Sequence, residues 1–212
     1  MIECFDFATA HHFGNALAEQ FRLRHRVFVQ RTSYDVPSWR EMEYDQYDTP
    51  AATYFAWRDE NGTARGVSRL SPTDRPYMVK DVWPGMVASR ALPSSTAVWE
   101  GTRFGVDKDL APVLRRRIVG ELVLGYLEFG LATGVRQIIG VMPTLIWRAV
   151  FSSNGWPVEL LGEPRVLGSD KCVAGLLSLS PEVLARVRAK TGIFRPVLKY
   201  AETDAVFERK VA

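Results

Sequence analysis

The chain has 212 residues, of which 47% are hydrophobic and 24% are charged, and its net charge is +3. This size and composition predict a single globular domain over residues 1–212 with a sizeable core. So small a net charge does not indicate nucleic-acid binding, and no stretch approaches the roughly 18 apolar residues of a membrane span. Cys4 and Cys172 lie far apart without metal-ligand spacing, so we expect no metal site and a reducing, cytoplasmic location.

The first predicted helix begins after Asn15 and runs to about residue 30. Its apolar positions share one face, and Arg24 lies within that face rather than on the solvated side. A buried guanidinium needs a carboxylate or an anionic ligand as its partner. The next segment, residues 32–52, is rich in turn formers, carboxylates and aromatic residues, and we expect an irregular but ordered loop there.

Strands and helices alternate through the rest of the chain. "TYFAWR" and "ARGVSRLS" predict a hairpin around the turn "DENG", with Arg69 ending its second strand. The segments that follow predict a strand over 96–106, a helix from Pro112 to about Gly134, a strand over 135–142, a helix ended by Gly155, strands over 157–161 and 171–179, and a helix over 181–190. This order predicts an α/β fold (an α+β three-layer sandwich) with helices on both faces of the sheet.

The strand "AVWEGTRFGV" contains two charged residues, Glu100 and Arg103, among apolar ones. Side chains of a flat strand alternate between the two faces, which would separate Glu100 from Arg103. We expect a bulge at Gly101 that turns both toward one cleft. The alternative is a single salt bridge that ties the strand edge to a loop.

The loop segment "EMEYDQYD" supplies three carboxylates, and the predicted ordered elements supply three arginines that need partners. We expect one ion network that joins the loop, the first helix and two strands. Such a network is either purely structural or a site for a zwitterionic ligand, with carboxylates for an ammonium and arginines for a carboxylate. Its members are Arg24, Glu43, Asp45, Asp48, Arg69 and Arg103.

Four motifs occur in order over roughly residues 20–105: "RLRHRVF", "EYDQYD", "RLSPT" and "WEGTRF". With them the chain resembles the LuxI-type acyl-homoserine-lactone synthases. The resemblance implies a mixed sheet similar to that of the GCN5-related N-acetyltransferases. It also implies that S-adenosylmethionine (SAM) is a substrate, not a cofactor, that accepts an acyl group from a thioester on its α-amine. The SAM carboxylate then closes the lactone and methylthioadenosine leaves, and no separate cofactor is needed.

The resemblance also assigns roles to individual residues. Glu100 is expected to be the general base, acting with Arg69 and Arg103 as the catalytic set. Tyr34 stands where the family usually has Trp, and Met142 stands where members that make 3-oxo signals commonly have Thr. The expected SAM site comprises Arg24, Phe28, Tyr34, Asp45, Asp48, Arg69 and Arg103, and the expected acyl pocket comprises Met142, Trp147 and Phe151.

The donor and the acyl chain stay open at this point. A basic surface with Arg115, Arg116, Arg117 and Arg148 suits an acidic acyl carrier protein (ACP) and the phosphates of coenzyme A (CoA) alike, so acyl-ACP and acyl-CoA are both candidates. Bulk at Trp147 and Phe151 indicates a short, branched or aromatic acyl group. The alternatives are an acyl-CoA N-acyltransferase acting on another amine without lactonisation, and an inactive acyltransferase-like domain that binds a partner or nucleic acid through its arginines.

Overall fold

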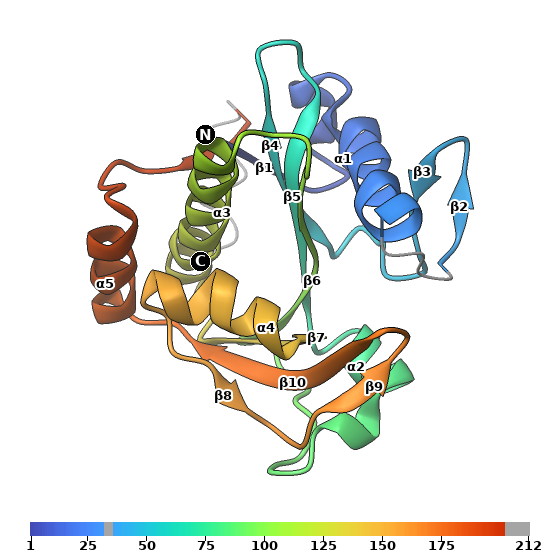
Figure 1. Ribbon diagram of the computed structural model, residues 1–212, viewed down its shortest axis with the longest axis vertical. Coiled ribbons are helices and arrows are strands. Elements are labelled where there is room, and N and C mark those ends of the chain that lie inside the picture. The colour runs from blue at the N-terminus through green and yellow to red at the C-terminus, as the bar shows by residue number, and fades with distance from the viewer. Residues whose placement is uncertain (32–35, 202–212) are drawn as a thin grey trace.

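One nine-stranded mixed sheet organises the chain (Figure 1). The computed structural model describes residues 1–31 and 36–201. The strands follow the order β11-β1-β4-β5-β6-β7-β10-β8, with β9 beside β10, and only β1–β11 and β6–β7 pair in parallel within this sheet, over the described residues. The strands are β1 (Ile2–Phe5), β4 (Thr53–Arg58), β5 (Ala64–Pro72), β6 (Val98–Val106), β7 (Gln137–Pro143), β8 (Glu159–Leu160), β9 (Arg165–Leu167), β10 (Asp170–Ser178) and β11 (Leu198–Lys199).

Helices cover both faces of this sheet, as Figure 1 shows. The long helix α3 (Pro112–Thr133) lies on one face with α5 (Pro181–Thr191) and with α4 (Thr144–Ile146), which continues as a π-helical turn over Trp147–Phe151. Helix α1 (Ala16–Arg24), its π-helical extension His25–Arg31 and the small hairpin β2 (Ser38–Trp39) and β3 (Met42–Glu43) lie on the other. The short helix α2 (Met78–Val82) follows β5. The predicted three-layer arrangement is therefore confirmed.

The core consists of separate apolar layers on the two faces of the sheet. Leu122, Leu127 and Phe151 belong to the layer beneath α3, whereas Leu23 and Val67 belong to the layer beneath α1. Alternation along β5 creates this division, because neighbouring side chains of a strand point to opposite faces. The position of a residue in the strand ladder therefore determines on which face of the sheet its side chain lies.

Most of the predicted elements are present with the expected start and stop residues. The hairpin β4–β5 and helices α3 and α5 are confirmed, and Gly134, Gly155 and Gly192 end their helices at φ of +78°, +88° and +70°. The prediction that Arg69 ends β5 is wrong, because the strand continues to Pro72. Strands β1, β2, β3, β9 and β11 were not predicted, and the irregular loop expected over 32–52 contains the β2–β3 hairpin. Each of these strands is four residues or shorter, which leaves too little pattern to read. The single-domain organisation stays a prediction.

Strands β6 and β7 begin as neighbours and then part. They pair over Val98–Glu100 and Gln137–Ile139, after which β6 continues beside β5 and β7 continues beside β10. Glu100 therefore lies at the last paired position, where the sheet opens between the two strands.

Candidate active site

A bulge in β6 brings Glu100 and Arg103 to the same face of the sheet. The ladder between β5 and β6 shifts register at Ser68, so that Arg103 and Phe104 both lie opposite this one residue. Arg103 adopts φ of +55°, a left-handed conformation that is uncommon for a residue with a Cβ. The extra residue reverses the alternation beyond it. The predicted bulge is present, but its predicted position at Gly101 is wrong, because the left-handed residue is Arg103 itself.

Glu100 is buried at 1% exposure and is held by backbone amides rather than by a salt bridge. Its Oε1 accepts the N–H of Val79 at 2.6 Å and its Oε2 accepts the N–H of Met78 at 3.0 Å, both in the first turn of α2. Burial raises the pKa of Glu100 to about 7, although these two amides and the charge of Arg69 act to lower it. The carboxyl group is thus poised to exchange a proton near neutral pH. The alternative was a single salt bridge that ties the strand edge to a loop. It is wrong for Glu100, because the carboxylates that pair with arginines in this part of the described chain are those of the loop, such as Glu43.

The predicted ion network is present, and Arg24 lies at its centre. Arg24 is fully buried and donates from Nε to Glu43 Oε2 at 2.5 Å and from Nη1 and Nη2 to Asp48 at 2.7 and 2.9 Å. Tyr54 adds a hydrogen bond to Asp48 at 3.0 Å. Burial acts to raise the pKa of Asp48, but the hydrogen bonds and charge of Arg24 outweigh it and lower the pKa to about 2. Asp48 is therefore charged near neutral pH.

Arg69 and Arg103 complete the network through Asp45. Arg69 donates to Asp45 Oδ1 and Oδ2 at 2.7 and 3.1 Å, in the two-pronged geometry typical of guanidinium and carboxylate. Arg103 Nη2 lies 2.7 Å from Asp45 Oδ2 and 2.9 Å from Glu43 Oε1. Three guanidiniums thus neutralise three carboxylates. The Arg103 side chain is 12% exposed, against 0% for Arg24 and 1% for Arg69, so it is the arginine of the three that a ligand reaches most easily.

Glu43 was predicted to join the network and was not predicted for the SAM site. In the structure it connects two arginines of the network. It is fully buried and bridges Arg24 to Arg103. Its place in the loop segment "EMEYDQYD" was the available signal. Met78 links the network to Glu100, because its N–H binds Glu100 and its sulfur lies 3.8 Å from Arg103 Nη1.

The two aromatic residues predicted for the SAM site have different outcomes. The Phe28 ring lies 5.7 Å from the Arg103 guanidinium carbon and belongs to the π-helical extension of α1. Phe28 thus lies beside the network, as a residue that packs against a ligand there must. Tyr34 lies outside the described residues.

The three residues predicted for the acyl pocket gather on the opposite face of the sheet, under α3. Trp147 and Phe151 are buried, with ring centroids 5.3 Å apart, and the half-buried Met142 packs against the same layer. Phe104 and Tyr126 also contact Phe151, at centroid distances of 5.8 and 6.4 Å, and neither was predicted.

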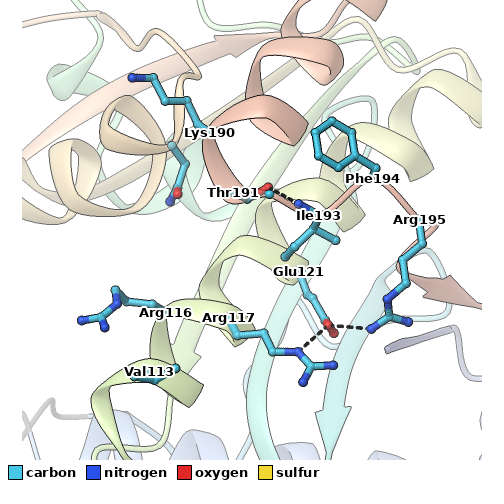
Figure 2. A pocket seen from close by; sticks show the side chains of 11 residues that line it. Val113, Arg116, Arg117, Glu121, Lys190, Thr191, Ile193, Phe194 and Arg195 are labelled. Carbon is cyan, nitrogen blue, oxygen red and sulfur yellow. Dashed lines mark hydrogen bonds and ion pairs between the residues drawn. The ribbon is translucent and has the colours of Figure 1, made fainter.

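Two surface hollows accompany these sites. One of about 440 Å³ borders Asp45 and Asp48 and is otherwise lined mainly by apolar residues, including Phe21 and Trp39. The other, of about 620 Å³, lies between α3 and the turn after α5 and includes Arg116, Arg117, Lys190 and Arg195 among its lining residues. In Figure 2, Arg117 and Arg195 converge on Glu121, with N–O distances of 3.1 and 3.2 Å to Oε1. This basic hollow lies on the α3 side of the sheet, away from the ion network.

Within residues 1–31 and 36–201, no helix combines the length and apolar content needed to cross a membrane. The mixed sheet with helices on both faces has the fold of the GCN5-related acetyltransferases. A putative N-acetyltransferase from Lactobacillus plantarum superposes with a TM-score of 0.54 over 84% of this chain and 99% of its own, at 15% identity, which shows the shared fold.

The chain belongs to the autoinducer synthase family, whose model matches residues 9–187. It is 35% identical to an acyl-homoserine-lactone synthase of Aeromonas hydrophila over 152 residues, which are 70% of this chain and 72% of that protein. It is 28% identical to the isovaleryl-homoserine lactone synthase of Bradyrhizobium diazoefficiens over 91% of this chain and 86% of that protein. The predicted family, fold and acyltransferase class are thus confirmed.

A solved structure extends this likeness over the whole chain. BjaI, described as a CoA-dependent acyl-homoserine lactone synthase with SAM and isopentyl-CoA, superposes with a TM-score of 0.86 over 100% of this chain and 98% of its own, at 25% identity.

Proposed function

We propose that this chain synthesises an N-acyl-L-homoserine lactone from SAM and an acyl-CoA whose acyl group is short and branched or aromatic. The observation that carries the reaction is the buried Glu100 carboxyl at the opening between β6 and β7, on the same face as the arginine network. SAM is consumed as a substrate, and no separate cofactor takes part. The cytoplasmic location expected from the sequence belongs to the same proposal.

In the first step, Glu100 takes a proton from the SAM α-ammonium. Each Glu100 oxygen already accepts one backbone N–H, which leaves a lone pair on each for this proton. The amine nitrogen then attacks the thioester carbonyl carbon and forms the amide bond. The carbon–sulfur bond of the thioester breaks, and the second proton of the amine passes to the sulfur, so that CoA leaves as the thiol. The raised pKa of Glu100 favours this step, because a base is most effective when its pKa lies near the working pH.

In the second step, an oxygen of the SAM carboxylate attacks the γ-carbon of the same molecule. The carbon–sulfur bond breaks, its electrons return to the sulfonium sulfur, and methylthioadenosine leaves. Arg103 is the guanidinium best exposed to orient that carboxylate, whereas Arg24 and Arg69 hold Asp48 and Asp45 in place. Phe28 packs beside Arg103 and borders the same space.

The choice of acyl-CoA and of a compact acyl group rests on two observations. BjaI, which covers the whole chain, is described with isopentyl-CoA, and the Bradyrhizobium relative is named for an isovaleryl product. In this chain, Phe151 packs against Trp147, Phe104 and Tyr126, and Met142 belongs to the same apolar layer, so bulky side chains favour a compact acyl group. The basic residues Arg115, Arg116, Arg117 and Arg148 suit either carrier, so acyl-ACP is the alternative that the test must address.

The test supplies purified protein with SAM and with straight, branched and aromatic acyl groups, each presented as a CoA thioester and as an ACP thioester. We expect mass spectrometry to detect an acyl-homoserine lactone and methylthioadenosine, with the highest kcat/KM for a branched or aromatic acyl-CoA. Turnover with acyl-ACP alone would show that the carrier is ACP and not CoA, and the proposed reaction would stand. An acylated amine without methylthioadenosine would establish the non-lactonising N-acyltransferase. A ligand at ~100 times its Kd stabilises the folded state by ~2.7 kcal/mol, so if saturating millimolar SAM does not raise the thermal midpoint, SAM does not bind and the proposed reaction is excluded.

A further inference from the structure

The bulge in β6 is anchored from the opposite face of the sheet by Ser68. Ser68 is the single β5 residue opposite Arg103 and Phe104. Its side chain is 2% exposed and points toward α3, and its Oγ donates to the carbonyl oxygen of Thr102 at 3.2 Å, immediately before Arg103. Ser68 thus contacts β6 at the point where its ladder is interrupted.

Tyr126 of α3 extends this contact into a chain. The Ser68 and Tyr126 hydroxyls are hydrogen bonded to each other, and both are buried. A serine hydroxyl has one hydrogen. Since Ser68 gives that hydrogen to Thr102, Tyr126 must donate to Ser68. The chain therefore runs from Tyr126 through Ser68 to the Thr102 carbonyl.

The tyrosine is itself fixed by its surroundings. Its ring lies edge-on to Phe55 and Phe104, with centroid distances of 5.4 and 6.1 Å, and stacks near Phe151. A Cβ added at Gly101 would lie 3.4 Å from the tyrosine ring and its hydroxyl. The ring thus has little freedom, and its hydroxyl is held at one position against the strand.

Arg103 needs such support. Its φ of +55° is strained for any residue with a Cβ, and a strained backbone persists only where its surroundings fix it. The ion pairs with Glu43 and Asp45 fix the far end of the Arg103 side chain. The hydrogen-bond chain fixes the carbonyl of the residue before it, from the opposite face of the sheet.

We propose that Tyr126 and Ser68 are positioning residues that hold Arg103 in its left-handed conformation and so aim its guanidinium at the SAM site. The link to SAM rests on the proposed function, whereas the link to the Arg103 backbone does not. Neither residue touches the reacting atoms in this scheme. Both act through the Thr102 carbonyl.

The kinetic test uses Tyr126→Phe, Ser68→Ala and the double variant, with Ser68→Thr as the conservative rescue. We expect the KM for SAM to rise ~10-fold in each deletion, the loss associated with one buried hydrogen bond. The KM for acyl-CoA stays near wild type because Phe keeps the ring that borders the acyl face. Ser68→Thr restores the hydroxyl and the low KM for SAM. The double variant raises the KM for SAM no more than the more damaging single deletion does, because the effects of residues that act as one unit do not add.

Thr133→Val is the matched control, because it removes from the same helix a hydroxyl that donates to the Phe129 carbonyl at 2.8 Å. We expect it to leave the KM for SAM unchanged. An unchanged KM in both single deletions, additive losses, or failure of Ser68→Thr to recover would each overturn the proposal.

A crystal structure of Ser68→Ala separates this inference from the proposed function. We expect Arg103 to leave the left-handed region and its contact with Glu43 to lengthen, whether or not the protein makes a lactone. Retention of both features would overturn the positioning role even in an active synthase. A wild-type protein that makes no lactone would overturn the proposed function, and the Arg103 geometry in this variant would still decide the positioning role.

Discussion

Glu100 Oε1 accepts the backbone N–H of Val79 at 2.6 Å, so the carboxyl group proposed as a base also anchors the first turn of α2 to the sheet. The same residue therefore has a structural and a chemical role. Burial makes its charge costly while the amides make it tolerable, and the two effects leave its pKa at about 7. Changes at Glu100 must be interpreted with both roles in view.

The first prediction concerns the pH dependence of the rate. Below pH ~7 the Glu100 carboxyl is mostly protonated and cannot accept the ammonium proton, so kcat/KM for SAM should rise as pH increases through about 7. Stopped assays between pH 5.5 and 8.5 measure this limb of the profile. In Glu100→Gln we expect a rate that is lower by ~100-fold or more and that does not rise with pH through 7. If kcat/KM of the variant still rises with pH as in wild type, the group that titrates is the SAM ammonium and not Glu100.

The second prediction concerns stability. The pKa of Glu100 is about 7 in the folded protein and near its ordinary value of 4.5 when unfolded, so its stabilising contribution is complete below 4.5 and is lost as pH rises through 7. The loss amounts to roughly 3 kcal/mol at ~1.4 kcal/mol per pH unit. Urea denaturation of wild type and Glu100→Gln at pH 5 and pH 8 measures it. The Gln side chain of the variant does not titrate. It places an amide against a backbone N–H at both pH values, so the loss that this contact causes in the free energy of unfolding is the same at pH 5 and pH 8. A wild-type advantage that does not shrink toward pH 8 would contradict the prediction.

The role of Arg103 shows what the sequence can and cannot predict. Alternation indicated that a bulge was needed between Glu100 and Arg103, and Gly101 was the obvious place because glycine tolerates unusual φ values. In the structure, a Cβ at Gly101 would lie 3.1 Å from Ile138 Cγ2, so this glycine serves close packing. The strained conformation falls on Arg103 instead, because ion pairs and the Ser68 contact hold it there. Such tertiary support leaves no local pattern in the sequence.

The ion network was predictable for the opposite reason. Arg24 occupies an apolar helix face and therefore needed a buried carboxylate, and the acidic segment that contains Glu43 was the available source of one. The need for pairing identifies such residues from the sequence alone. Tyr126 gave no comparable signal, because a tyrosine on the apolar face of a long helix is ordinary and its hydroxyl partner lies 58 positions away.

The third prediction tests the burial of the network. Arg24→Ala leaves the buried carboxylates of Glu43 and Asp48 without their shared guanidinium, and we expect a loss of ~3–5 kcal/mol in the free energy of unfolding. Arg22→Ala is the matched control on the same helix. Arg22 is 45% exposed and pairs with Glu19 at 2.6 Å, so its removal should cost ~1 kcal/mol or less. Urea denaturation at pH 7 compares the two, and equal midpoints would show that Arg24 is not a buried anchor.

The fourth prediction concerns the acyl group. Phe151 packs against Trp147 at 5.3 Å and against Phe104 at 5.8 Å, so Phe151→Leu opens space where the acyl chain is proposed to end. A pocket that differs by one methylene changes discrimination by roughly 10-fold or more, so the ratio of longer to shorter lactone products should rise by at least that factor. Competition between two acyl-CoA donors, with products counted by mass spectrometry, measures this ratio. Phe129→Leu removes a ring from the same apolar layer, where Phe129 packs on Trp99 at 5.3 Å, and should leave the ratio unchanged. An equal shift in both variants would mean that general loosening of the core, and not the wall formed by Phe151, sets acyl length.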